Sequence, residues 1–300
     1  MIELKKSTSV YKMSCKNTPV ARCCSGDTVV FETEDCFGGQ IKTEKQLMNG
    51  IVWDNINPAT GPLFVEGAMP GDILKVEIHS IELESQGAMC DSPGEGITGK
   101  VIKDEATKIF QIKDGYAVFN DKLRFPVSPM IGVIGTAPAD GLEIETGTPG
   151  SHGGNMDCNQ IGENSILYLP VNTEGALLAM GDVHSLMGNG EVCVCGVETP
   201  AKVTVTVTVI KGRKLPTPFL VTKDNFMTIY SAENLDAAVQ GATLSMRQFL
   251  IDELGMDEHE SGFLLSTIGN AEICQCVDPQ ETCRMEVSRY VTDQYGYQFY

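Results

Sequence analysis

The chain has 300 residues, of which 40 are acidic and 22 are basic, and its formal net charge is −18. A field of this sign repels phosphate backbones and anionic lipid surfaces, which excludes nucleic acid and membrane as partners. No stretch reaches the roughly 18 apolar residues of a membrane helix, and the N-terminus lacks the apolar core of a signal peptide. We therefore expect a cytoplasmic protein.

The first half of the chain is predicted to consist of strands and turns. Strands are expected at residues 28–33 and 72–83, the second because apolar and polar side chains alternate along it. Residues 87–99 are glycine-rich and are predicted to form a loop. Residues 101–120 are typical of a hairpin, because Asp114-Gly115 favours a tight turn.

The second half contains the clearest strand and two helices. Valines and threonines alternate over residues 202–210, the pattern of a half-buried strand. Apolar spacing predicts a helix over residues 231–254, with Ser231 as its N-cap and Gly255 after its end. A shorter helix is expected at about 258–268, capped by Asp257, and a final strand at 271–277.

These elements predict a β-dominated α+β fold of β-sandwich or barrel-like subdomains with a late helical pair. Residues 1–300 are expected to form one unit, which could comprise two or three closely packed subdomains. The chain has eleven cysteines but no C-x-x-C pair. We interpret them as small buried residues in a reducing cytoplasm, with a thiolate metal site or a redox pair as alternatives.

The first segment that suggests chemistry is glycine-rich and contains one of the four histidines. His152 is followed by Gly153, Gly154, Asn155 and Asp157. The two glycines permit a positive φ and close backbone approach to a ligand. One nitrogen and two oxygen functions so close together suit a metal corner or a general-base cluster, and a structural loop with a satisfied histidine is the alternative. Two other histidines, His79 and His259, are expected at the surface.

The second such segment, residues 181–191, contains His184. If a strand ends there, Asp182 shares a face with His184 because side chains alternate along a strand. Asn189-Gly190 predicts a tight turn, and a return strand would bring Glu191 beside His184 and end at Glu198. Such a cluster suits a divalent ion such as zinc, and a hydrogen-bonded cluster without metal is the alternative.

A third segment contributes one more carboxylate. Asp35 precedes the Gly38-Gly39 turn and could reach the same site. An acidic loop tip is the alternative interpretation of this segment.

Taken in order, these segments and several others resemble one known family. The blocks that carry the resemblance are residues 32–35, 38–41, 60–68, 70–72, 129–138, 152–157, 169–171 and 181–191, with a weaker block at 274–279. Together they resemble the acetamidase/formamidase family. The resemblance implies hydrolysis of short aliphatic amides to a carboxylate and ammonia, a mainly β fold and a homo-oligomer, such as a homodimer. It also implies an amidase without a serine nucleophile, and the chain has no G-x-S-x-G motif.

The roles of individual residues follow from what amide hydrolysis requires. A divalent metal, zinc or calcium, would activate water and polarise the carbonyl, with His152, Asp157 and His184 as its ligands. Glu191 is the leading general base, and Asp35 and Glu198 are the alternatives. Asn155 and the backbone of Gly153 and Gly154 would bind the carbonyl oxygen of a small neutral amide. Two other functions stay open: a non-catalytic cation-binding β protein, and a hydrolase of other linear C–N bonds, such as those of formylated amines or ureides.

Overall fold

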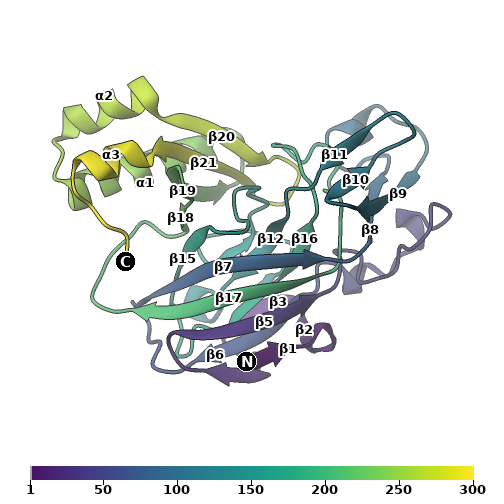
Figure 1. The fold of residues 1–300 in the computed structure, drawn as a ribbon, viewed down its shortest axis with the longest axis horizontal. Coiled ribbons are helices and arrows are strands. Elements are labelled where there is room, and N and C mark those ends of the chain that lie inside the picture. Colours follow the sequence, from purple (N-terminus) through teal and green to yellow (C-terminus); the bar gives the residue numbers. More distant parts are fainter. Residues whose placement is uncertain (1) are drawn as a thin grey trace.

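The computed structural model describes residues 2–300 and consists mainly of β-strands, with the helices gathered late in the chain (Figure 1). Its two largest sheets pack against each other across one large apolar core. The helices lie at one end of the molecule and a small hairpin sheet lies at the other (Figure 1). The predicted β-dominated α+β fold with late helices is confirmed.

The largest sheet has nine strands, in the order β1-β5-β17-β7-β15-β18-β19-β21-β20. Their bounds are β1 Ile2–Leu4, β5 Asp27–Thr33, β7 Ile73–Leu83, β15 Ile166–Pro170, β17 Ala201–Ile210, β18 Phe219–Val221, β19 Asn225–Ala232, β20 Asn270–Gln275 and β21 Glu281–Ser288. Along β17, Val203, Val205 and Val207 are fully buried, whereas the threonines between them are partly exposed. The strands predicted at 28–33, 72–83 and 202–210 are therefore confirmed, with valine burial as the physical reason.

The second sheet faces the first and carries the polar residues that matter below. Its strands are β2 Ser9–Val10, β4 Ala21–Cys23, β6 Ala59–Val65, β12 Met130–Gly135, β14 Gly153–Asn155 and β16 Leu178–His184. Ile131 and Val183 of this sheet share one core cluster with Val76 and Val205 of the nine-stranded sheet. Every residue of β16 is buried, including its polar residues Asp182 and His184.

Two smaller sheets complete the β-structure. The four-stranded one contains β8 Gln86–Asp91, β9 Ala106–Lys113, β10 Tyr116–Val118 and β11 Arg124–Pro126, and the two-stranded one contains β3 Lys12–Ser14 and β13 Glu143–Glu145. The hairpin predicted at Asp114-Gly115 is confirmed. The prediction of a loop over 87–99 is wrong for its first part, because β8 pairs with β9 along its whole length in spite of its glycine.

The helices are α1 Leu235–Leu254, α2 Glu258–Ile268 and α3 Arg289–Gln294. The second is capped by Asp257 as predicted, and Gly255 ends the first in the left-handed conformation. Ser231 is not the N-cap of α1, because it lies in β19 paired with Thr282, and Asn234 caps the helix instead. Strand β21 and helix α3 follow the strand that we predicted to be the last. No helix among the described residues is long and apolar enough to cross a bilayer.

Helix α1 packs against the nine-stranded sheet through a cluster of aromatic rings. Phe249 is 1% exposed, and its ring lies 4.9 Å from that of Phe219 and 5.4 Å from that of Phe226. The ring of Phe299 stacks on it from the C-terminal segment. This cluster buries large apolar areas, so it contributes strongly to the stability of the helical end.

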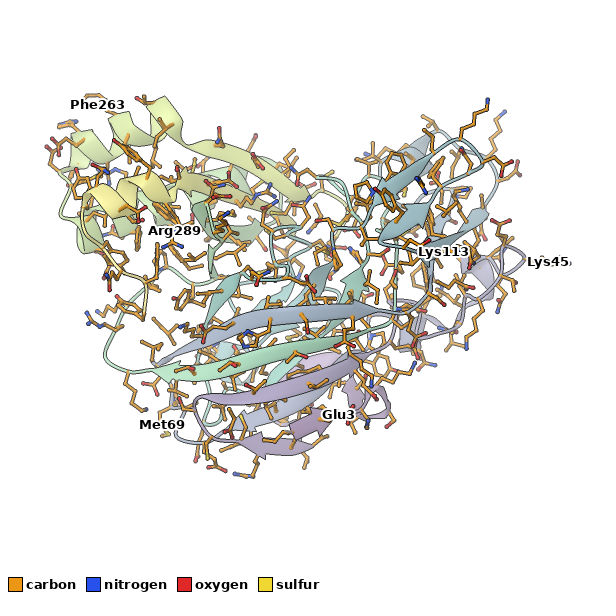
Figure 2. All side chains as sticks on the ribbon, in the orientation of Figure 1. Glu3, Lys45, Met69, Lys113, Phe263 and Arg289 are labelled. Atoms are coloured by element: carbon orange, nitrogen blue, oxygen red, sulfur yellow. The ribbon has the colours of Figure 1, made fainter. Side chains whose placement is uncertain are left out.

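We expect Phe249→Ala to lower the free energy of unfolding by about 3–5 kcal/mol, because it opens a cavity in this cluster. Phe263→Ala is the matched control, since Phe263 lies in the middle of α2 on the outer side of the molecule and is 70% exposed (Figure 2). The control should change stability by less than about 0.5 kcal/mol. Urea unfolding of the three proteins measures both effects, and equal losses would contradict the assignment of this cluster as a stabilising core.

Candidate active site

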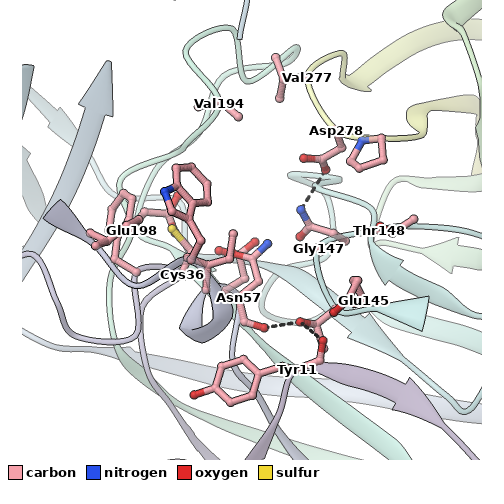
Figure 3. A pocket seen from close by; sticks show the side chains of 18 of the residues that line it. Tyr11, Cys36, Asn57, Glu145, Gly147, Thr148, Val194, Glu198, Val277 and Asp278 are labelled. Carbon is pink, nitrogen blue, oxygen red and sulfur yellow. Dashed lines mark hydrogen bonds between the residues drawn. The ribbon is translucent and has the colours of Figure 1, made fainter. Parts of the chain in front are cut away.

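A cavity of about 820 Å³ opens beside the six-stranded sheet. Its buried end carries carboxylates of Asp182, Glu191 and Glu198, and Asp278 and Asn155 line it as well. Figure 3 shows Glu198 and Cys36 on one side of the cavity and Asp278 on the other. These side chains come from distant parts of the sequence, so the cavity depends on the folded arrangement of the sheets.

The middle strands of the six-stranded sheet position the acids. β12 lies between β14 and β16, Asp157 follows β14, and Asp182 belongs to β16. Both carboxylates lie against Gly132 of β12, where a methyl group would come within 2.6 Å of Oδ2 of Asp182 and still closer to Oδ1 of Asp157. Gly196 leaves similar room for His184, whose Nδ1 would be 2.6 Å from an added Cβ. Because Gly132 and Gly196 have no side chain, there is space for the carboxylates and the imidazole of the site.

His184 is the centre of the acidic cluster. Its Nε2 lies 3.0 Å from Oε1 of Glu198, 3.3 Å from Oδ1 of Asp182, 3.9 Å from Oε1 of Glu191 and 4.0 Å from Oδ1 of Asp157. One ligand atom from each of Asp157, His184 and Glu191 lies within 4.8 Å of the other two, and the same holds for Cys36, Asp182 and Glu198. The two groups of potential ligands therefore meet at one imidazole.

The imidazole of His184 is the one source of positive charge for the acids of the cluster, among the described residues. Both carboxylate oxygens of Asp157 and Oε2 of Glu198 are buried without a hydrogen-bond partner, as is Oδ1 of Asn155. In residues 2–300, the only ion pairs of these four clustered carboxylates are those with His184. Burying an uncompensated carboxylate costs several kcal/mol, so such a cluster calls for a cation. Carboxylate oxygens and an imidazole nitrogen at these distances fit a divalent metal ion.

The shifts in the pKa values of the clustered residues also indicate that the acids have too little positive charge beside them. Burial raises the pKa of Glu198 to about 8. Burial and neighbouring acids raise the pKa values of Glu191 and Asp157 well above the ordinary range. Burial opposes protonation of His184, but Glu198 and Asp182 outweigh it and raise the pKa of the imidazole. The acids thus favour a positive charge at the position of Nε2, and a bound cation can take the place of that proton.

A polar pair lies on the other side of the cavity. Nδ2 of Asn155 donates a hydrogen bond to Oδ2 of Asp278 at 2.9 Å (Figure 3). Burial raises the pKa of Asp278 to about 8. Asn155 therefore has one N–H oriented by the protein, while its second N–H and its unpartnered Oδ1 remain for other contacts.

The structure brings together Asp157, His184, Glu191 and Glu198 of the residues singled out from the sequence. Glu191, predicted as the leading general base, shares a ligand group with Asp157 and His184. Asn155 lines the same cavity. As predicted, the remaining pair of histidines, His79 and His259, lies at the surface.

Among the described residues, His152 and Asp35 belong to neither group of potential metal ligands and do not line the cavity. His152 is buried with its Nε2 unpartnered, and burial lowers its pKa to about 4. Over residues 2–300, neither group of potential metal ligands includes it, so its role as a ligand stays a prediction. Asp35 accepts the N–H of Gly39 through Oδ1, which stabilises the turn that follows, and burial raises its pKa to about 6. Its role as a base also stays a prediction.

The glycines next to His152 have the positive φ expected of them, 94° at Gly153 and 81° at Gly154. Their close contacts are with the protein itself, since a Cβ at Gly154 would be 2.6 Å from the carbonyl oxygen of Thr148. The N–H of Gly153 donates to the carbonyl of Gly150. That donor is therefore occupied, and the proposed binding of a carbonyl oxygen rests on Asn155 more than on this backbone.

The return strand predicted from Glu191 to Glu198 is wrong. This stretch is an irregular loop in which Glu191 and Val194 have positive φ, and Glu198 forms only isolated bridges with Ala88 and His184. The loop is wider than the two-residue turn that Asn189-Gly190 suggested. Glu191 and Glu198 nevertheless both reach His184, because the loop folds back over the end of β16.

Two residues of the site, Asp278 and Cys36, received no role from the sequence, whereas Asp182 was expected beside His184 in a cluster that suits a divalent ion. Asp278 lies in the weakest of the blocks that carry the family resemblance. Cys36 directly follows Asp35, and it is the cysteine that lines the cavity. The general interpretation of the cysteines is confirmed in part: all eleven are free and several are buried, but Cys15 and Cys24 are exposed.

The loop that carries Glu191 is fixed by the C-terminal strands. Nη1 of Arg284, in β21, donates to Oδ1 of Asn189 at 3.2 Å, and its guanidinium also pairs with Glu272 in β20. The N–H of Gly190 donates to the carbonyl of Cys274 at 2.8 Å. Arg284 is only 2% exposed, so this link is shielded from water.

Comparison with known proteins gives the family. The model of the acetamidase/formamidase family matches residues 14–148 and 143–231. The chain belongs to the acetamidase/formamidase family. The resemblance found in its motifs is therefore confirmed over most of the chain.

Members of the acetamidase/formamidase family with solved structures cover the whole fold. An acetamidase from Bacillus halodurans is 46% identical, with a TM-score of 0.97 over 99% of this chain and 100% of that one. A predicted acetamidase/formamidase from Thermoanaerobacter tengcongensis is 44% identical, with a TM-score of 0.96 over 99% of each chain. A formamidase from Methylophilus methylotrophus is 23% identical over 250 residues, and the chain spans 61% of its length.

Substitution of Gly132 tests whether this acetamidase/formamidase family member needs the space that Gly132 leaves for the side chains of Asp157 and Asp182. We expect Gly132→Ala to displace Asp157 and Asp182 and to reduce catalysis about a hundredfold, since small displacements of reacting groups have large effects. Gly262→Ala, in α2 with open space around it, is the control and should leave activity unchanged. Turnover and circular dichroism are measured on both variants, and full activity of a folded Gly132→Ala protein would contradict this account of the site.

Proposed function

We propose that the chain hydrolyses small neutral amides to a carboxylate and ammonia at the acidic cluster around His184, with a divalent cation held by Asp157, His184 and Glu191. The observation that carries this proposal is the set of buried carboxylates whose oxygens lack partners. Family membership supports the reaction class.

Amide hydrolysis requires an activated water, a polarised carbonyl and a proton for the departing nitrogen. A divalent cation bound in this cluster would supply the first two, by lowering the pKa of water and by acting as a Lewis acid. The single imidazole among the ligands favours zinc, because calcium prefers oxygen ligands alone. Asn155 would orient the carbonyl oxygen through its free N–H.

We assign to Glu198 the transfer of the proton from water to the departing nitrogen. Its Oε2 is buried without a partner and its side chain lines the cavity beside the ligand group. Glu198 accepts one proton of the attacking water and returns it to the nitrogen as the C–N bond breaks, which releases ammonia and the carboxylic acid. The acid then gives its proton to ammonia or to solvent and becomes the carboxylate. Glu191, the leading base from sequence, is reassigned in this proposal to holding the cation.

Ammonia release from acetamide, formamide and propionamide, with and without chelator, tests the proposed reaction. We expect chelator to abolish turnover, and Asp157→Asn to remove the bound metal and lower turnover by more than the tenfold to hundredfold typical of outer-shell residues. Asp114→Asn, an exposed turn residue, is the isosteric control and should keep both metal and activity.

Two results would contradict the proposal. Full turnover by metal-free protein would remove the cation from the reaction. The second result has two parts: the protein hydrolyses no amide, N-formylated amine or ureide, and chelator lowers its melting temperature. Together these would favour the non-catalytic cation-binding alternative. The homodimer and the cytoplasmic location stay predictions from the sequence.

Glu198→Gln tests the proton assignment separately. We expect it to retain the metal and to lose about 10²–10⁴-fold in turnover, the usual contribution of general acid–base catalysis. Glu174→Gln, at an exposed position, is the control. Metal content and turnover are measured on both variants, and loss of the metal from Glu198→Gln would show that Glu198 is a ligand rather than the base.

A further inference from the structure

We propose that the outer part of the cavity is a binding subsite for an apolar acyl chain, so that the preferred substrates are primary amides longer than acetamide. This inference rests on the proposed function, because it places the reacting amide group at the acidic end of the same cavity. It extends that function by naming the part of the substrate that the cavity wall recognises.

The size of the cavity is the first observation. Its volume of about 820 Å³ lies in the range of roughly 300–1,000 Å³ that is typical of sites for drug-sized ligands. A molecule as small as acetamide would leave most of this space to water. The volume therefore fits a substrate with a substantial group attached to the amide.

The wall that faces this space is apolar. It is formed by Phe37, Met48, Ile51, Trp53 and Ile56, which all come from the segment between β5 and β6. Phe37 and Met48 are buried, at 3% and 7% exposure, and form the deeper part of the wall. Val277 lines the cavity from the C-terminal segment, on the side of Asp278 (Figure 3). An acidic end joined to an apolar wall fits a ligand with a polar head and an apolar tail.

Trp53 is the second observation. It is the only tryptophan of the chain, it lines the cavity, and it is 49% exposed. It lies in the short helical turn η3 Trp53–Asn55, which presents it at the surface. About half of this large aromatic side chain is left open, and at a cavity wall that open surface offers apolar contact area to a ligand.

The charged residues that line the cavity limit which acyl chains it can bind. Besides the site acids, the cavity is lined by Asp54, Glu95 and Glu145. Lys12 alone is basic among the described lining residues, and its Nζ lies 2.8 Å from Oε1 of Glu145. An acyl chain that ends in a carboxylate would meet repulsion here. A neutral aliphatic or aryl-alkyl chain would not.

The first experiment compares kcat/KM for acetamide, butyramide and hexanamide. We expect an increase of about fourfold for each methylene that the wall buries. Trp53→Ala should lower the ratio of hexanamide to acetamide activity at least tenfold. Val52→Ala is the matched control, since Val52 is the neighbouring residue, is 54% exposed and does not line the cavity, and its ratio should equal that of the unmodified protein.

Two further substrates define the class. N-pentylformamide is an isomer of hexanamide that carries its chain on nitrogen, and succinamic acid carries a carboxylate on its acyl chain. Both should be poorer substrates than hexanamide, as measured by formate and ammonia release. Rates that fall with acyl length, or that favour N-pentylformamide, would overturn the acyl subsite.

Fluorescence of Trp53 separates this inference from the proposed function. Hexanamide should give a saturable change in tryptophan emission of the full chain, whereas acetamide at the same concentration should not. If no amide is hydrolysed, the proposed function fails, yet a saturable change with hexanamide would still support the subsite. Absence of any change up to the solubility limit of hexanamide would overturn it.

Discussion

The site depends on the burial of several carboxylates around one imidazole, with no arginine or lysine of the described chain paired to them. Each buried charge without a partner opposes folding, so the surrounding structure must keep the acids together against their repulsion. The sandwich does this because β16 is buried along its whole length between neighbouring strands. In the proposed function, the same repulsion would give the cluster its affinity for a cation, because a bound cation would offset the charge of the buried acids.

Some residues of the site are held by strands and others by irregular loops. Strand β16 holds Asp182 and His184, and β14 leads directly to Asp157. Glu191, Glu198 and most of the apolar wall come instead from loops outside the strands. Gly196 lets the loop approach His184 closely, and Gly132 leaves room for Asp157 and Asp182. Catalytic and binding residues are commonly carried by loops that a rigid scaffold positions in this way.

The sequence predicted correctly those elements that depend on interactions between residues close together in the chain. The valine–threonine alternation in β17, the cap at Asp257 and the Asp114-Gly115 turn follow from burial, hydrogen bonding and φ preferences within a few residues. The convergence of Asp157, His184 and Glu191 was also within reach, because their motifs are specific. Asp278 and Cys36 were not, since their positions depend on pairing between distant strands. The irregular loop before Glu198 likewise follows from tertiary contacts that override its turn signal.

The family match ends at residue 231, whereas Asp278 and the strands that hold the Glu191 loop lie beyond it. The acids around His184 therefore come from one stretch of the chain, and part of the chamber beside them is built by another. A change in the turn between β20 and β21, which carries Asp278, would alter the shape and polarity of that wall while the strands that hold Asp182 and His184 stay as they are. Selectivity could be changed there without rebuilding the acidic cluster.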